Sequence, residues 1–108
     1  MPSNRLTETP LYRLQLFVSG TGSRSARAIV NVRRLCEKYL RGRYSLDVID
    51  ITRHPARARE EQLVAVPTLI KLAPIPTRRF IGDMSRTDSI LGGLELAAEA
   101  AAVQAGRR

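Results

Sequence analysis

The alternation of apolar and polar residues marks the first half of the chain as a strand–helix–strand unit. Residues 11–18 alternate in part and then become apolar, and residues 44–51 alternate over most of their length, as half-buried strands do. Between them, residues 25–41 place apolar side chains at spacings of three and four, which predicts an amphipathic helix. The spacing of this unit predicts two parallel strands joined by a right-handed crossover.

The second half of the chain predicts a short helix and two strands. Residues 56–63 have high helix propensity. Residues 64–72 form an apolar strand, and Pro67 must lie at its entry because proline lacks the N–H group that a strand interior uses. The stiff connector 73–76 separates this strand from a short one at 78–81.

The remaining apolar segment predicts a last helix. Ser85 and Asp88 have the spacing of a capping box, so we expect the helix to begin there and to run towards Val103. Adjacent glycines at 92 and 93 interrupt this segment, and each costs roughly 1 kcal/mol against alanine in a helix. Either they let the helix pack closely on the sheet, or the segment has a weak local preference and can also form a strand.

The length of 108 residues predicts one α/β domain with the element order β-α-β-α-β-β-α. We expect it to span residues 11–103, between a polar lead-in at 1–10 and a frayed tail at 104–108. The chain has neither an apolar signal core at its start nor an apolar run long enough to span a membrane. A cytoplasmic protein with no membrane partner is therefore expected.

The formal net charge of +8, from 18 Lys and Arg against 10 Asp and Glu, raises the question of a nucleic-acid partner. However, the cations are scattered in runs of no more than two. The aromatic residues make up only 5% of the chain and are too spread out to form a base-stacking platform. Both features argue against nucleic-acid binding.

The segment Val66-Pro67-Thr68, at a strand entrance after a short helix, resembles the cis-proline corner of thioredoxins. A thioredoxin carries Cys-x-x-Cys at the start of its first core helix, where the helix N-terminus makes a thiol nucleophilic. Residues 21–25, at that position here, contain no cysteine. The single Cys36 lies on the apolar stripe of the predicted helix and is expected to be a small buried hydrophobe. Disulfide exchange is therefore not expected.

Other enzyme chemistries also lack their residues. The one histidine, His54, lies in a turn without a neighbouring nucleophile, and the adjacent Glu60 and Glu61 would diverge on a helix. The glycines at 20 and 22 lack the remaining residues of a phosphate-binding loop. We therefore expect no enzyme activity, no metal site and no cofactor.

Residues 66–85 closely resemble the signature of the KaiB family of circadian clock proteins: a Pro-Thr-Leu block, a proline-rich connector, an arginine pair and an Ile-Gly-Asp-x-Ser ending. Residues 16–20 and 44–50 resemble the family's first two strands, and His54-Pro55 its turn. The resemblance extends from Tyr12 to about Leu96.

The resemblance implies a metamorphic protein. The ground-state fold of KaiB proteins has the order β-α-β-β-α-α-β and is often tetrameric, so a homo-tetramer or dimer is implied at rest. A rarer thioredoxin-like monomer binds the N-terminal ATPase ring of KaiC. In cyanobacteria that complex then captures KaiA. The tail at 97–108 is rich in alanine and ends in two arginines, whereas cyanobacterial members tend to end in an acidic tail. This departure argues against a KaiA partner.

The function implied is that of an adaptor for a KaiC-like ATPase, through a fold-switched thioredoxin-like state. The candidate partner-binding residues are charged positions near the first helix and the proline connector: Arg24, Arg27, Arg78, Arg79 and Asp83. The candidate fold-switch residues are those with unusual backbone freedom or restriction: Pro67, Pro74, Pro76, Gly92 and Gly93.

Two alternatives stay open at this point. One is a KaiB-like sensory module of a histidine kinase system. The other is a redox protein that works through Cys36 alone. The alanine-rich segment 97–102 favours a C-terminal helix, so we expect the thioredoxin-like order at rest.

Overall fold

The computed structural model describes residues 11–20 and 22–96. Its elements follow the order expected from the sequence: β1 (Tyr12–Val18), α1 (Ser23–Tyr39), β2 (Tyr44–Asp50), α2 (Pro55–Glu60), β3 (Thr68–Ala73), β4 (Arg78–Ile81) and α3 (Thr87–Gly93). The expected lead-in 1–10, the end of the last helix beyond residue 96 and the tail 104–108 lie outside the described residues.

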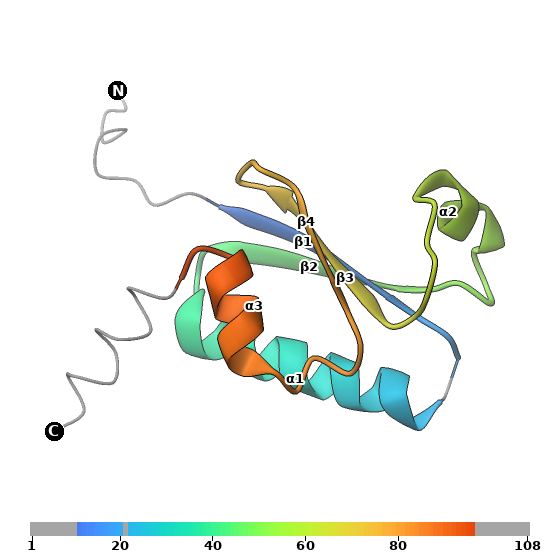
Figure 1. The fold of residues 1–108 in the computed structure, drawn as a ribbon, viewed down its shortest axis with the longest axis horizontal. Helices are drawn as coiled ribbons and strands as arrows, with labels where there is room; N and C mark the ends of the chain where they lie inside the picture. The colour runs from blue at the N-terminus through green and yellow to red at the C-terminus, as the bar shows by residue number, and fades with distance from the viewer. Residues whose placement is uncertain (1–10, 21, 97–108) are drawn as a thin grey trace, which may run out of the picture.

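The strands form one sheet in the order β2-β1-β3-β4. β1 and β2 are parallel, with Tyr12 opposite Tyr44, and this confirms the predicted crossover through α1. β3 runs antiparallel to β1, and β4 runs antiparallel to β3. Helices α1 and α3 lie together on one side of the sheet, and α2 lies beyond its other end (Figure 1). The two ends of α1 are therefore joined to the two central parallel strands.

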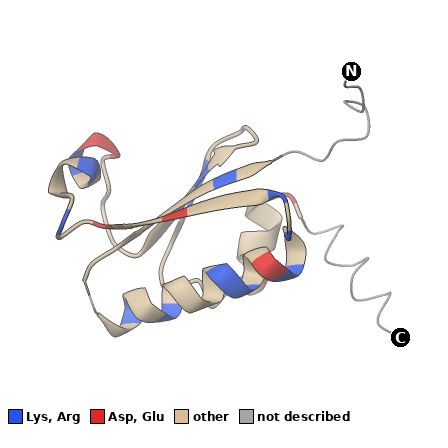
Figure 2. Cartoon of the chain, turned by 180° about the vertical axis from the view of Figure 1, so that it is seen from behind, with Lys and Arg blue, Asp and Glu red and all other residues tan. Residues whose placement is uncertain are grey.

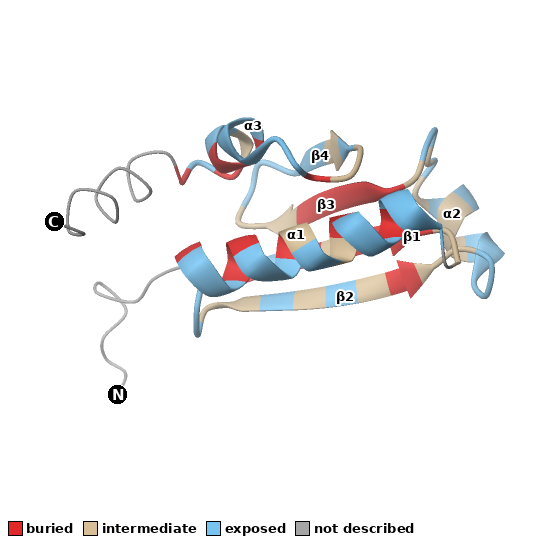
Figure 3. Ribbon diagram, turned by 90° about the horizontal axis from the view of Figure 1, so that it is seen from below, coloured by how far each residue is buried: buried red, intermediate tan, exposed pale blue. Residues whose placement is uncertain are grey.

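Alternation along β1 divides the core between the two faces of the sheet. Leu14 and Leu16 face α1 and α3, where they join the larger apolar cluster. Phe17 points to the opposite face, where it packs with Ile49 and Ile70 in a smaller cluster. The guanidinium of Arg57 in α2 lies 5.7 Å from the centroid of the Phe17 ring. Figure 3 shows the buried residues concentrated on β1, β3 and the inner sides of α1 and α3.

The strand entry at Pro67 is as predicted. The Val66–Pro67 bond is cis, and β3 begins at the next residue, Thr68. The expected start of this strand at residue 64 is wrong, because residues 64–67 form the turn that leads into it. The Ala73–Pro74 and Ile75–Pro76 bonds of the connector are also cis.

The start of the last helix differs from the capping box expected at Ser85 and Asp88. The N-cap residue is Arg86, and no side chain caps the helix. The Ser85 N–H instead donates to Asp83 Oδ1 at 3.0 Å. The serine therefore belongs to the turn after β4, and a contact within that turn replaces the expected cap.

The same helix ends at Gly93, and does not continue towards Val103 as expected. Glu95 has a φ of 64°, and its N–H donates to the Gly92 carbonyl at 3.0 Å. The Leu96 N–H donates to the Leu91 carbonyl at 2.7 Å. These two bonds form a Schellman motif, which closes a helix by turning one residue into the left-handed region. Residues 97–103 lie outside the described part of the chain.

Candidate partner-binding surface

The position of the thioredoxin dithiol contains no sulfur among the residues described. Gly22 is the N-cap of α1, and Ser23 begins it. Cys36 lies more than two turns further along and is 0% exposed. Burial and the nearby charge of Glu37 raise the pKa of the Cys36 thiol to about 12. Because the thiolate is the reactive form, this cysteine has no means of redox chemistry in this fold.

Asp83, just after β4, fastens the turn before α3 to the side of α1. Its Oδ2 accepts a hydrogen bond from Arg27 Nε at 3.3 Å, and its carbonyl accepts one from Asn31 Nδ2 at 2.9 Å. Hydrogen bonds from Ser85, and then the Arg27 guanidinium, lower the pKa of Asp83. Two of the predicted partner-binding residues, Arg27 and Asp83, are thus brought together and neutralise each other.

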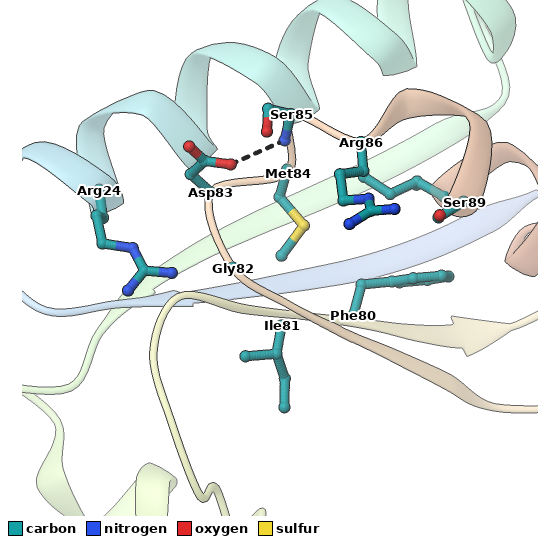
Figure 4. Close-up of a pocket in the computed structure, with 10 residues that line it drawn as sticks. Arg24, Phe80, Ile81, Gly82, Asp83, Met84, Ser85, Arg86 and Ser89 are labelled. Carbon is teal, nitrogen blue, oxygen red and sulfur yellow. Dashed lines mark hydrogen bonds between the residues drawn. The ribbon is translucent and has the colours of Figure 1, made fainter.

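A cleft of about 350 Å³ opens beside this ion pair, between the start of α1 and the start of α3. Figure 4 shows Arg24 on one side of it and Arg86 on the other, with Phe80 and Met84 between them. Arg24 reaches towards Gly82, whose φ of 119° is in the region that favours glycine. Arg24 was predicted from the sequence, but Arg86 was not, because its position opposite Arg24 depends on how α3 packs.

The arginine pair of β4 does not act as one cluster. Alternation along the strand sends Arg78 to the same face as Phe80 and Arg79 to the opposite face. Arg79 Nη2 donates to the Glu61 carbonyl at 2.6 Å and lies 3.7 Å from Glu61 Oε1. Arg79 is therefore held to the end of α2, away from Arg24, Arg27 and Asp83. Figure 2 shows the basic residues spread over α1, α2 and the strands.

The two glycines of α3 have different environments. A Cβ added to Gly93 would collide with the ring of Phe80, so close packing explains this position. A Cβ on Gly92 would meet nothing within 4 Å. Of the predicted fold-switch residues, Gly93 therefore has a packing role in this fold, and Gly92 has no steric one.

Lys71 in β3 is a feature that the sequence analysis missed. Its side chain is 0% exposed and points into the larger apolar cluster, on the face shared with Leu69. Its ammonium has no hydrogen-bond acceptor and lies 6.0 Å from the centroid of the Tyr12 ring. A buried unpaired charge is costly. The only signal in the sequence is a lysine among apolar residues of a predicted strand.

The fold and the sulfur-free redox position define a thioredoxin-like domain without dithiol chemistry. Solved structures agree on the fold. The N-terminal domain of Synechococcus elongatus SasA matches with a TM-score of 0.69 and 24% identity, over 92% of this chain and 91% of that one. Mitochondrial thioredoxin 3 of Saccharomyces cerevisiae matches with a TM-score of 0.65 and 17% identity, over 84% of each chain.

Sequence comparison supplies the family. The KaiB domain model matches residues 15–96, and the chain belongs to the KaiB family. Circadian clock protein KaiB3 of Synechocystis is 43% identical over 86 residues, which cover 80% of this chain and 84% of that protein. Circadian clock oscillator protein KaiB of Thermosynechococcus vestitus is 42% identical over 85 residues, which cover 79% of each. The resemblance predicted from residues 66–85 is confirmed.

Within the described residues, no helix has the length and apolar character that a membrane span requires. His, Cys, Asp and Glu side chains of the same residues form no group of three or more that could hold a metal ion. The surface around Asp83, rather than a catalytic centre, is the candidate functional site.

Proposed function

We propose that this chain is a circadian-clock adaptor that binds the N-terminal ATPase ring of a KaiC-like protein and modulates its phosphorylation and ATPase cycle. The observation that carries the proposal is the KaiB family match over residues 15–96, on a thioredoxin-like fold whose only cysteine is buried. A scaffold without accessible thiol chemistry acts through the surface that it presents.

The proposed binding surface comprises the charged residues that the sequence singled out: Arg24, Arg27, Arg78, Arg79 and Asp83. The Arg27–Asp83 pair contributes mainly by fixing the turn before α3, since its charges are mutually satisfied. Arg24 and Arg78 are exposed cations that can complement an acidic partner and speed encounter with it.

We further propose that the competent state is the thioredoxin-like fold and that it competes with a second packing of the C-terminal half. The proposed switch positions are Pro67, Pro74, Pro76, Gly92 and Gly93. The buried ammonium of Lys71 supports a small free-energy gap, because it lowers the stability of the packing described here. If the competent state is a minor population, the apparent affinity falls by its fraction. The resting assembly is then a homo-tetramer or dimer.

The test is complex formation between the purified full chain and a KaiC-like ATPase hexamer, followed by size-exclusion chromatography with ATP present. We expect a slowly forming complex that Arg27→Ala weakens. The matched control is Arg33→Ala, which removes an exposed arginine elsewhere on α1. No complex under any nucleotide condition would count against the proposal. The same result would favour the sensory-module hypothesis, which shares the family.

A further inference from the structure

The cleft between α1 and α3 has an apolar floor at which two cations converge. Phe80, Met84 and Ile90 line it, and Met84 and Ile90 are buried within the larger apolar cluster. Arg24 and Arg86 line the same cleft and are both exposed. Its volume of about 350 Å³ lies at the lower end of the range of roughly 300–1,000 Å³ typical of ligand pockets.

The two guanidinium groups are available to a ligand. Neither Arg24 nor Arg86 forms a hydrogen bond or ion pair with any residue that the structure describes. Arg27 and Arg79, by contrast, are occupied by Asp83 and Glu61. The one carboxylate in the lining, Asp83, is neutralised by Arg27 and accepts a hydrogen bond from Ser85. The cleft therefore has a net positive potential above an apolar surface.

We propose that this cleft binds an acidic segment of a partner protein in which one apolar side chain is flanked by carboxylates. The apolar side chain would cover Phe80 and Met84, and the flanking carboxylates would pair with Arg24 and Arg86. Guanidinium–carboxylate pairs are directional and bidentate, so two of them on opposite rims fix the orientation of an extended segment. The cations lie on two separate elements and not in a continuous stripe, so a protein segment suits the cleft better than a nucleic-acid backbone.

The inference rests on the proposed function only for the identity of the partner, because the ATPase ring would supply the segment. The chemistry of the cleft can be tested without that partner. The probe is an acetylated and amidated peptide with the sequence Ser-Asp-Leu-Glu-Ser, added to the full chain labelled with ¹⁵N. We expect amide shift changes at residues 24, 80–86 and 89–90.

Two altered probes separate the contributions of the floor and the rims. A peptide with serine in place of leucine tests the floor, and one with Asn and Gln in place of Asp and Glu tests the rims. We expect each to bind about tenfold more weakly, the loss expected for one good charged or apolar contact. Equal binding of the altered peptides, or of inorganic phosphate at the same residues, would overturn the proposal. Stronger binding of a single-stranded DNA oligonucleotide at these residues would also overturn it.

Protein variants complete the test. Arg24→Gln and Arg86→Gln change exposed side chains and should each weaken peptide binding about tenfold, with unchanged circular dichroism. Arg33→Gln, on α1 outside the cleft, should have no effect. If the peptide occupies the cleft but no ATPase ring binds, the cleft stands and the proposed function fails. If the ring binds while neither peptide nor variants show an effect, the function stands and the cleft fails.

Discussion

The backbone of Gly93 in α3 lies against the ring of Phe80 in β4, too close for any side chain at Gly93. This contact joins the last helix to the edge strand and closes the apolar cluster on that face of the sheet. We predict that Gly93→Ala lowers the free energy of unfolding by about 1–2 kcal/mol, since overpacking outweighs the gain in helix propensity. Urea unfolding monitored by circular dichroism measures it.

The control for that substitution is the neighbouring glycine. Gly92→Ala adds a methyl group where nothing lies within 4 Å, so we expect unchanged or raised stability, by up to about 1 kcal/mol. Equal effects of the two substitutions would show that Phe80 does not decide the identity of residue 93.

A second prediction concerns the unpaired ammonium of Lys71. Lys71→Met keeps an unbranched side chain and removes the buried charge, so we expect the free energy of unfolding to rise by about 1–3 kcal/mol. The matched control is Lys38→Met, at an exposed position of α1, which should change it by less than about 0.5 kcal/mol. A loss of stability in Lys71→Met would mean that its contact with the Tyr12 ring outweighs the cost of burial.

A third prediction follows from the lowered pKa of Asp83, caused by hydrogen bonds from Ser85 and then by Arg27. A carboxyl group whose folded-state pKa is depressed stabilises the fold above its unfolded pKa and loses that contribution as pH falls through the folded value. Asp83→Asn should therefore be less stable than the parent at neutral pH, and the difference should shrink below about pH 4. Thermal unfolding across pH measures the difference.

The comparison variant for Asp83 is Asp47→Asn, which changes an exposed carboxyl group in β2. Its effect should be small and similar at all pH values. A difference for Asp83→Asn that stays constant down to acid pH would argue that the carboxylate charge contributes nothing and that only the shape of the side chain matters.

A fourth prediction concerns Cys36. With a thiol pKa of about 12 and no exposure, the native chain should react with a thiol reagent at about pH 8 roughly a thousandfold more slowly than an unstructured cysteine. Reaction in denaturant supplies the reference rate. Native-state labelling at the reference rate would show that residues around Cys36 open readily, and it would revive a redox role.

A fifth prediction concerns the end of α3. Glu95 occupies the left-handed position of the Schellman motif, where glycine is the usual residue. Glu95→Gly should raise the free energy of unfolding by about 0.5–1 kcal/mol, whereas Glu95→Ala should leave it nearly unchanged. Chemical unfolding of both variants tests the motif. A stabilisation that is equal in the two variants would point to the charge of Glu95 and not to its backbone conformation.

The sequence by itself determined the order of elements, the parallel pairing of β1 with β2, the cis-proline entry to β3 and the burial of Cys36. These features follow from local periods of two and 3.6 residues and from the backbone limits of proline. The KaiB family was also evident in the sequence, because residues 66–85 carry its signature as contiguous motifs.

The tertiary structure decided where α3 ends, which arginines are neutralised and what lines the cleft. Helix propensity alone extends α3 through its alanines, but the left-handed turn at Glu95 closes it and buries Leu96. Arg79 pairs with Glu61, and Arg86 comes to face Arg24 across Phe80, only once the sheet and helices have packed. Contacts between residues distant in the chain depend on the packing of whole elements, and no local pattern encodes them.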